Sequence, residues 1–248
     1  MATREPLAAG VEWPPTEDEL PCDDGMPMET QRHVLQLQLL MDPLLLHWAD
    51  RQDVFVGGNM FVYFSLEQVR TQDFRGPDFF VALDVPRRER KSWVVWQEGK
   101  GPDLVIELLS ESTADQDKGV KKQIYQAQLR VPEYVWFDPF SGEWAGFALR
   151  DGVYEPVVPD AQDRLISQRL QLALVRWEGT YQEVEAQWLR WATLEGLLLP
   201  TGAELAERER RQAEGAREQA EAARQQVAAL ETLLARYRAR FGELPGEQ

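Results

Sequence analysis

Residues 104–109 of this 248-residue chain read LVIELL, a run that is apolar at every position except one. An uninterrupted apolar run of this length is typical of a strand that is buried on both faces of a sheet. Its one charge, Glu107, is conspicuous because a carboxylate inside a core requires a hydrogen-bonding or ionic partner. Glu107 is therefore either part of a functional site or a buried acid with an ordinary structural partner.

Helices and strands are predicted on both sides of this run. The spacing of apolar residues predicts a helix over about 28–50, which Pro43 should kink or break with Asp42 capping a second piece, and another over about 115–129. We expect strands over 54–64, as a hairpin with a Gly-Gly-Asn turn, and over 77–85, 93–97, 134–138, 143–149 with 153–158, and 165–176. This order predicts an α/β (α+β) fold in which helices flank a mixed sheet with added β-hairpins.

The segment 201–242 is of a different kind, because its apolar residues recur in alternating steps of three and four. That alternation is the heptad pattern of a coiled coil. The pattern consists of Ala213, Ala216, Ala220, Ala223, Val227, Leu230, Leu234, Tyr237 and Phe241. The alternative is a single solvated helix. We expect a coiled coil that mediates self-association as a homodimer, with strand number and orientation left open.

The charge is spread unevenly along the chain. The formal net charge is −15, of which residues 1–30 carry −7, residues 31–200 carry −7 and residues 201–248 carry −1. We therefore expect an acidic leader without structure of its own over 1–27, a folded domain over 28–200, the coiled-coil helix over 201–242 and a tail over 243–248. Such a charge argues against binding nucleic acid by bulk positive charge, but divalent-metal sites are built from carboxylates.

The sequence also bears on the compartment. Cys22 is the single cysteine, so no disulfide framework can form within the chain, which fits a reducing compartment. The first 15 residues lack the layout of a signal peptide, and no apolar run approaches the roughly 20 residues of a membrane span. We expect a soluble, cytoplasmic protein without a membrane segment.

Two carboxylates and a lysine form the most informative constellation. Asp78 begins an otherwise apolar strand, Glu107 interrupts another, and Lys121 lies on the following helix. If the two strands are neighbours, the carboxylates converge, and they then require a proton or a divalent cation between them. Oxygen ligands favour Mg²⁺ or Mn²⁺ over zinc, and a lysine beside them can orient an attacking water.

These residues stand in a pattern that resembles a known nuclease family. The segments PDLVIELLSEST (102–113), DKGVK (117–121) and VPEYVWFDP (131–139) resemble the Uma-type family of bacterial restriction endonucleases, within the PD-(D/E)xK superfamily. The resemblance covers about 28–200 and implies a restriction-endonuclease-like fold and DNA as the substrate. It implies that Asp78 and Glu107 are the metal-binding acids and that Asp78, Glu107 and Lys121 are catalytic.

The chain departs from the superfamily pattern at two positions. Leu109 stands where the superfamily lysine would lie, two residues after the glutamate, and the resemblance places that lysine on the next helix, at Lys121. Lys122 is the alternative. Glu111 replaces a proline that is usual in the family, which puts the local turn in doubt and not the site.

Ordinary structural roles compete with several of these assignments. Asp117 and Lys121 can form an i,i+4 ion pair on a solvated helix face, or Asp117 can orient the lysine. His33 and Glu29 can lean toward the site from the first helix. The basic patch formed by Arg87, Arg88, Arg90 and Lys91 is the best candidate for contact with a phosphate backbone, but charge on an exposed loop is equally ordinary.

Two classes of function remain. The first is a Mg²⁺-dependent endonuclease that hydrolyses phosphodiester bonds in DNA, with two sites in a dimer so that each cuts one strand. The second is a catalytically silent protein of nuclease fold that acts as a coiled-coil interaction or scaffolding module. Binding of magnesium or manganese discriminates between them, because a scaffold needs neither.

Overall fold

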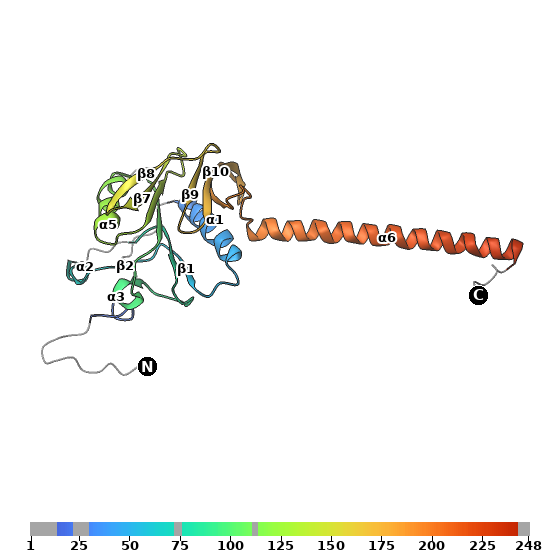
Figure 1. Ribbon diagram of the computed structural model, residues 1–248, viewed down its shortest axis with the longest axis horizontal. Helices are drawn as coiled ribbons and strands as arrows, with labels where there is room; N and C mark the ends of the chain where they lie inside the picture. Colours follow the sequence, from blue (N-terminus) through green and yellow to red (C-terminus); the bar gives the residue numbers. More distant parts are fainter. Residues whose placement is uncertain (1–13, 22–29, 72–75, 111–113, 243–248) are drawn as a thin grey trace, which may run out of the picture. The chain divides into compact units, whose positions relative to one another are not determined.

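The computed structural model describes residues 14–21, 30–71, 76–110 and 114–242 (Figure 1). The chain divides into two compact units, Met1–Leu199, here called the body, and Pro200–Gln248. Most of the expected acidic leader, with Glu29 and Cys22, lies outside the described residues, as does the tail over 243–248.

A six-stranded mixed sheet is the framework of the body. Its order is β1-β3-β5-β6-β7-β8, and only the β5–β6 pair is parallel. The strands are β1 (Val54–Gly58), β3 (Phe79–Leu83), β5 (Leu104–Leu108), β6 (Glu133–Phe137), β7 (Trp144–Arg150) and β8 (Val153–Val157). All five residues of β5 are buried, as its apolar run predicts, and β5 lies between β3 and β6. The expected mixed-sheet α+β class is confirmed.

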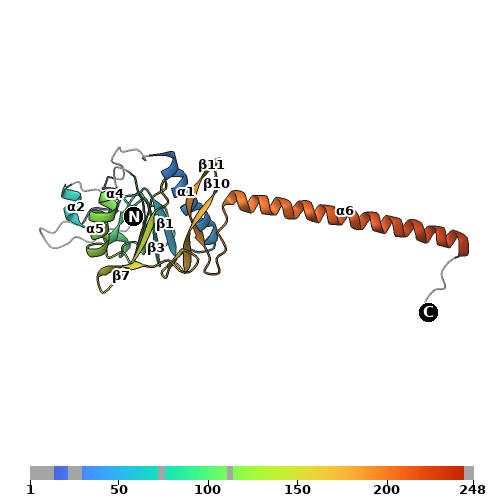
Figure 2. The same cartoon turned by 90° about the horizontal axis from the view of Figure 1, so that it is seen from above.

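The two faces of this sheet are covered by different helices. Side chains alternate along each strand, so Phe79 and Ile106 face α1 (Gln31–His47), whereas Phe80 and Val105 face the helical segment 114–127. That segment consists of α4 (Ala114–Gln116), a π-helical turn η1 (Asp117–Lys121) and α5 (Lys122–Ala127). It lies on the other side of the strands from α1 in the view from above (Figure 2). The predicted helix over 115–129 is thus confirmed, with a π turn that the sequence did not predict.

A second sheet packs against α1 and against the same face of the first sheet. It contains β9 (Arg164–Ser167), β10 (Leu172–Tyr181) and β11 (Val184–Ala192), all antiparallel. Gln36 fixes the contact, because its side-chain amide bonds both the N–H and the C=O of Leu189. Pro43 lies inside α1, which continues from residue 31 to residue 47 without a break. The expected alternative of a second helix capped by Asp42 is therefore wrong.

Two predicted strand assignments need correction. Residues 54–64 do not form a hairpin: β1 pairs with β3, whereas β2 (Val62–Tyr63) pairs in parallel with β4 (Trp93–Val94). The backbone N–H of Asn59 donates to the C=O of Asp78 at 3.0 Å, which ties the end of β1 to β3. The predicted strand over 93–97 ends after two residues, and α3 (Val95–Glu98) follows and stops at Gly99 in the left-handed region. A further helix among the described residues of the body is α2 (Leu66–Thr71).

Residues 14–21 of the expected leader pack against the body. Leu20 is buried beside Tyr63 and Val94, and the indole N–H of Trp96 donates to the C=O of Pro15 at 2.8 Å. This differs from the expectation of a leader without structure of its own. The Pro- and acid-rich composition of the leader does not predict that Leu20 packs against residues more than 40 positions away in the sequence.

The second unit is one long helix, α6 (Gly202–Phe241). Thr201 caps its start in a capping box with Glu204, and Gly242 at φ 80° ends it. No described residue of α6 is buried. In the part of the chain that the structure covers, no helix combines the length and apolar character that crossing a membrane requires.

Candidate active site

Strand register brings Asp78 and Glu107 together. In the antiparallel β3–β5 pair, Phe79 lies opposite Ile106, so the residue before Phe79 meets the residue after Ile106. Both acids share the face of Phe80 and Val105, which is the face covered by the segment 114–127. Two acids that are 29 positions apart in the sequence therefore meet on one edge of one face.

Each of the two carboxyl groups lies against the backbone beside the other acid. The N–H of Leu108, the residue that follows Glu107, donates to Asp78 Oδ2 at 2.7 Å. The N–H of Asp78 points at Glu107 Oε2 at 3.4 Å. Glu107 is fully buried, whereas Asp78 is partly exposed. The pair thus has one member in the core and one at its margin.

The helical segment supplies a lysine to this pair. Lys121 Nζ lies 3.2 Å from Glu107 Oε2 and 2.6 Å from Asp117 Oδ1. The hydroxyl of Tyr125 donates to Glu107 Oε1 at 2.6 Å. Spacing of four places Asp117, Lys121 and Tyr125 on one face of the helix, toward the sheet. The π turn that carries Asp117 and Lys121 is of a kind that often occurs at functional sites.

Burial and charge set the protonation states of the cluster. Burial raises the pKa of Glu107 to about 7, and the neighbouring Asp78 charge adds to this, while Lys121 opposes it. Burial also raises the pKa of Asp78. Burial by itself would lower the pKa of Lys121, but the charges of Glu107, Asp117 and Asp78 outweigh it, so the pKa of Lys121 is raised. The ammonium group therefore stays charged, and the acid pair holds a proton more strongly than an exposed pair does.

The structure distinguishes between the two candidate lysines. Lys121 contacts the acid pair, whereas Lys122 Nζ lies over the ring of Phe147, 3.3 Å from its centroid. Asp117 does pair with Lys121, but it is fully buried and is not on a solvated helix face. Its position fits the other interpretation, in which it orients the lysine.

The His33 ring is held by hydrogen bonds to Thr30 and Leu109 and makes no contact with Asp78, Glu107 or Lys121 among those described. Its Nε2 lies 3.1 Å from the C=O of Leu109 and its Nδ1 lies 2.8 Å from Thr30 Oγ1, so both ring nitrogens are engaged. Glu29 and Glu111 lie outside the described residues. Among the residues whose placement is described, no set of three or more His, Cys, Asp or Glu side chains is arranged to hold a metal ion.

Two tyrosines in the cluster were given no role in the sequence interpretation. Tyr125 fixes the orientation of the Glu107 carboxyl group, and the hydroxyl of Tyr134 donates to the backbone C=O of Asp117 at 2.8 Å. Burial raises the pKa of both phenols, so they remain donors. The spacing of four between Lys121 and Tyr125 was the one available signal, because it placed the phenol on the face of the lysine.

The basic patch is not at this site. Its residues follow the C-terminal end of β3, whereas Asp78 precedes the N-terminal end, so a strand of about 17 Å separates them. Its charges are also paired. Arg88 contacts Glu17 and Glu98, and Lys91 contacts Asp18. Arg90 is paired with Glu98, and Arg87 donates to three backbone carbonyls at the end of α1. The interpretation as a phosphate-backbone contact loses its support.

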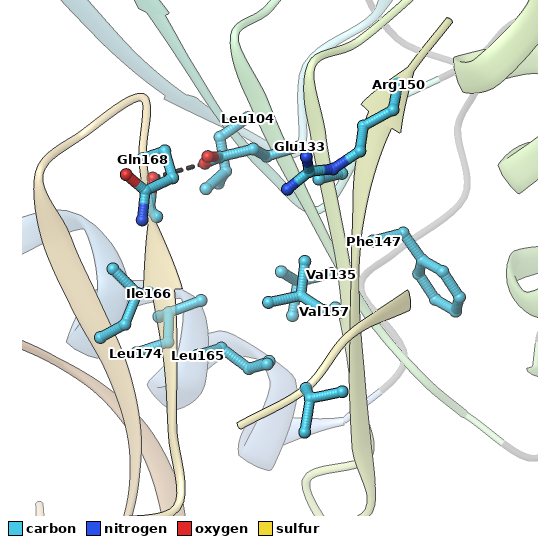
Figure 3. A pocket seen from close by; sticks show the side chains of 14 residues that line it. Leu104, Glu133, Val135, Phe147, Arg150, Val157, Leu165, Ile166, Gln168 and Leu174 are labelled. Atoms are coloured by element: carbon cyan, nitrogen blue, oxygen red, sulfur yellow. Dashed lines mark hydrogen bonds between the residues drawn. The ribbon is translucent and has the colours of Figure 1, made fainter. Parts of the chain in front are cut away.

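A separate cavity of about 230 Å³ lies on the opposite face of the sheet, between β6–β8 and the β9–β10 pair. Its lining is mostly apolar, and the polar side chains of Glu133, Arg150 and Gln168 gather toward one end (Figure 3). Glu133 accepts hydrogen bonds from the Ser167 hydroxyl and the Arg169 N–H, at 2.5 and 3.0 Å. Since Leu104 and Val135 line this cavity, it lies on the α1 side of the sheet and apart from Glu107.

Comparison with known proteins agrees with the resemblance drawn from the motifs. The Uma2 family, which carries the description "Putative restriction endonuclease", matches residues 24–178. Among solved structures, the chain is similar to a "putative nuclease belonging to DUF820" from Anabaena variabilis, with 19% identity, a TM-score of 0.41, and coverage of 60% of this chain and 88% of that one. No curated protein gives a significant match. The family match spans more than half of the chain and includes Asp78, Glu107 and Lys121, so the chain belongs to the Uma2 family.

Proposed function

We propose that the protein is a Mg²⁺- or Mn²⁺-dependent endonuclease that hydrolyses phosphodiester bonds in DNA. Asp78 and Glu107 hold the metal, and Lys121 assists the attacking water. The observation that carries the proposal is that the β3–β5 register brings Asp78 and Glu107 together, with the Lys121 ammonium group 3.2 Å from Glu107 Oε2. Membership of the family supports it.

The charge of the cluster fits a divalent cation. Three carboxyl groups, those of Asp78, Glu107 and Asp117, surround one ammonium group, so the fully ionised cluster carries a net charge of −2. A low-dielectric site compensates such an excess with a proton or a cation. Magnesium is commonly held by one or two carboxylates, with water and phosphate oxygens as the other ligands, so two acids suffice.

Each side chain of the cluster has a distinct task in this proposal. A cation held by the two acids would lower the pKa of a bound water and offset charge on the phosphate. Lys121 places a positive charge beside the reacting phosphate and orients water. Asp117 keeps this ammonium group charged and in position, and Tyr125 holds the Glu107 carboxyl group in one orientation.

Metal binding gives the first test. Isothermal titration with MgCl₂ or MnCl₂ should show binding to the wild type and none to Asp78→Asn, because the amide removes one anionic ligand. Asp138→Asn is the matched control, since Asp138 lies at the end of the neighbouring strand and its carboxylate is used by Ser141 and Phe140 within its own turn. Wild-type protein that binds neither metal would favour the silent scaffold over the nuclease.

The lysine gives the second test. Lys121→Met should reduce plasmid cleavage about 100-fold, the loss typical for one electrostatic group in a site. It should also destabilise the fold by about 3 kcal/mol because Asp117 is left as a buried, uncompensated charge. Lys122→Met should leave the cleavage rate unchanged. The double variant Asp117→Asn/Lys121→Met should regain stability but not cleavage, and a return of cleavage would exclude a catalytic role for Lys121.

We further propose that the protein is a cytoplasmic homodimer that assembles through α6, with residues 28–200 as the nuclease-like domain. The exposed heptad residues of α6 support self-association, and the single cysteine fits a reducing compartment. Light scattering of the intact chain should give twice its mass of 28.5 kDa. Removal of residues 201–248 should return a monomer.

A further inference from the structure

Helix α6 exposes an apolar stripe that a single helix in water would not keep. Val227, Leu230, Leu234, Tyr237 and Phe241 have exposed fractions between 38% and 67%. All five belong to the heptad series, so they lie along one side of a helix whose other residues are mostly charged, glutamine or alanine. A stripe of this kind is the surface that a partner helix covers.

The size of the side chains changes along this stripe. In heptad notation, the a positions are Ala213, Ala220, Val227, Leu234 and Phe241, and the d positions are Ala216, Ala223, Leu230 and Tyr237. Every heptad residue before 227 is alanine, and every one from 227 onward is larger. The stripe therefore has a small-residue half and a large-residue half within one uninterrupted helix.

A parallel pair in register does not fit this gradient. Each residue would face its own copy, so Ala216 would meet alanine while Tyr237 and Phe241 would meet aromatic rings. The distance between packed helices depends on the side chains at the contact. The two helices would approach closely at one end and separate at the other. Close packing along the whole stripe would require a changing distance between the axes.

The residues beside the stripe give no support to the parallel arrangement either. Parallel dimers are commonly fixed by ion pairs between e and g positions. In α6 the first three g positions are Gln212, Gln219 and Gln226, and the fourth is Leu233. None of these four residues carries a charge, so none can form such a pair.

We propose that α6 binds a second copy of this chain in antiparallel orientation, a deepening of the homodimer proposed above. In the register that we assign, facing residue numbers sum to 457. Phe241 then faces Ala216, Tyr237 faces Ala220, Leu234 faces Ala223, and Val227 faces Leu230. Each layer except the central ones joins a large residue to a small one, which keeps the distance between the helices even.

This pairing has a consequence for how the two copies are arranged. The overlap runs from residue 216 to residue 241, about 39 Å at a rise of about 1.5 Å per residue. The N-termini of the two helices, at Gly202, are then about 80 Å apart. Paired α6 helices therefore act as a spacer between the two copies. This differs from the dimer expected from the sequence, in which two active sites act on the two strands of one DNA duplex.

Disulfide cross-linking in a Cys22→Ser background tests the proposal without any assay of DNA cleavage. Chains with Ala223→Cys and chains with Leu234→Cys, one of them carrying a tag that changes its size, are co-expressed and oxidised. We expect a mixed disulfide dimer, because these positions face each other. Each variant alone should stay uncross-linked, since residue 234 and its own copy are about 16 Å apart along the pair, beyond the reach of a disulfide.

The other outcomes overturn the proposal in identifiable ways. Cross-linking of Leu234→Cys with itself would show a parallel pair. Cross-linking of Leu234→Cys with Ala216→Cys in place of Ala223→Cys would show an antiparallel pair shifted by one heptad and overturn the register. A monomeric mass, with circular dichroism confirming that α6 is intact, would exclude pairing altogether. Because none of these readouts uses DNA, loss of the nuclease proposal would leave the result unaffected.

Discussion

Replacing Glu107 by glutamine should abolish metal-dependent DNA cleavage and leave the folded protein at least as stable as the wild type at pH 8. The amide removes an anionic metal ligand but keeps the shape of the side chain and an oxygen for the Tyr125 hydroxyl. We expect the cleavage rate to fall at least about 1,000-fold, the equivalent of about 4 kcal/mol of transition-state stabilisation.

The stability of this variant follows from the cost of ionising a buried acid. At pH 8 the wild-type Glu107, with a pKa of about 7, is charged inside the core beside Asp78. Glutamine removes that repulsion and can donate to the Asp78 carboxylate, while Lys121 keeps its ion pair with Asp117. Part of the gain is offset by loss of the Lys121–Glu107 contact. The net expected gain in the free energy of unfolding is about 1 kcal/mol.

A matched control is available on the neighbouring strand. Glu133 is also a buried glutamate with a raised pKa, but it lies on the other face of the sheet and bonds Ser167. Glu133→Gln should keep the cleavage rate within a few-fold of wild type. Urea denaturation and plasmid cleavage on both variants decide the question. A Glu107→Gln protein that cleaves normally, or that loses several kcal/mol of stability, would show that Glu107 is a structural acid.

Local sequence patterns predicted the two strands at which the candidate acids lie. The apolar run at 104–109 predicted β5, the apolar stretch after Asp78 predicted β3, and the resemblance selected Lys121 on the following helix. Their convergence depended on one condition, that the two strands are neighbours, and the β3–β5 register meets it. Patterns of period two and of spacing four carry this information because they report which face a residue occupies.

Long-range pairing was beyond these patterns. A Gly-Gly-Asn turn is a good hairpin signal, yet β1 pairs with β3, and the N–H of Asn59 donates to the C=O of Asp78, 19 positions away. The basic patch looked like a candidate nucleic-acid contact because Glu17 and Asp18, which neutralise part of it, are more than 70 positions away. The π turn was missed for a different reason, since DKGVK has no composition that distinguishes it from an α-helical turn.

The metal-free protein should lose stability as the pH rises from about 4.5 to about 7, and magnesium should cancel that loss. Over this range the folded protein keeps a proton on Glu107 that the unfolded chain releases, because folding raises the pKa from 4.5 to about 7. The native state then binds more protons than the unfolded state, so the free energy of unfolding falls with increasing pH. The loss begins near pH 4.5, ends near pH 7 and amounts to about 3 kcal/mol.

Comparison with Glu107→Gln separates the titration of the Asp78–Glu107 pair from that of groups elsewhere in the chain. Glu133 also has a raised pKa and contributes a slope of the same sign, but it does so equally in both proteins. Urea unfolding in EDTA at pH 5 and pH 8 should show the wild type losing about 2.5 kcal/mol more than the variant. Saturating MgCl₂ at pH 8 should raise the stability of the wild type only, because the cation replaces the proton between two carboxylates that otherwise repel each other. Equal pH slopes in the two proteins would mean that Glu107 is ionised at little cost, and the charge argument for a metal at this site would then fail.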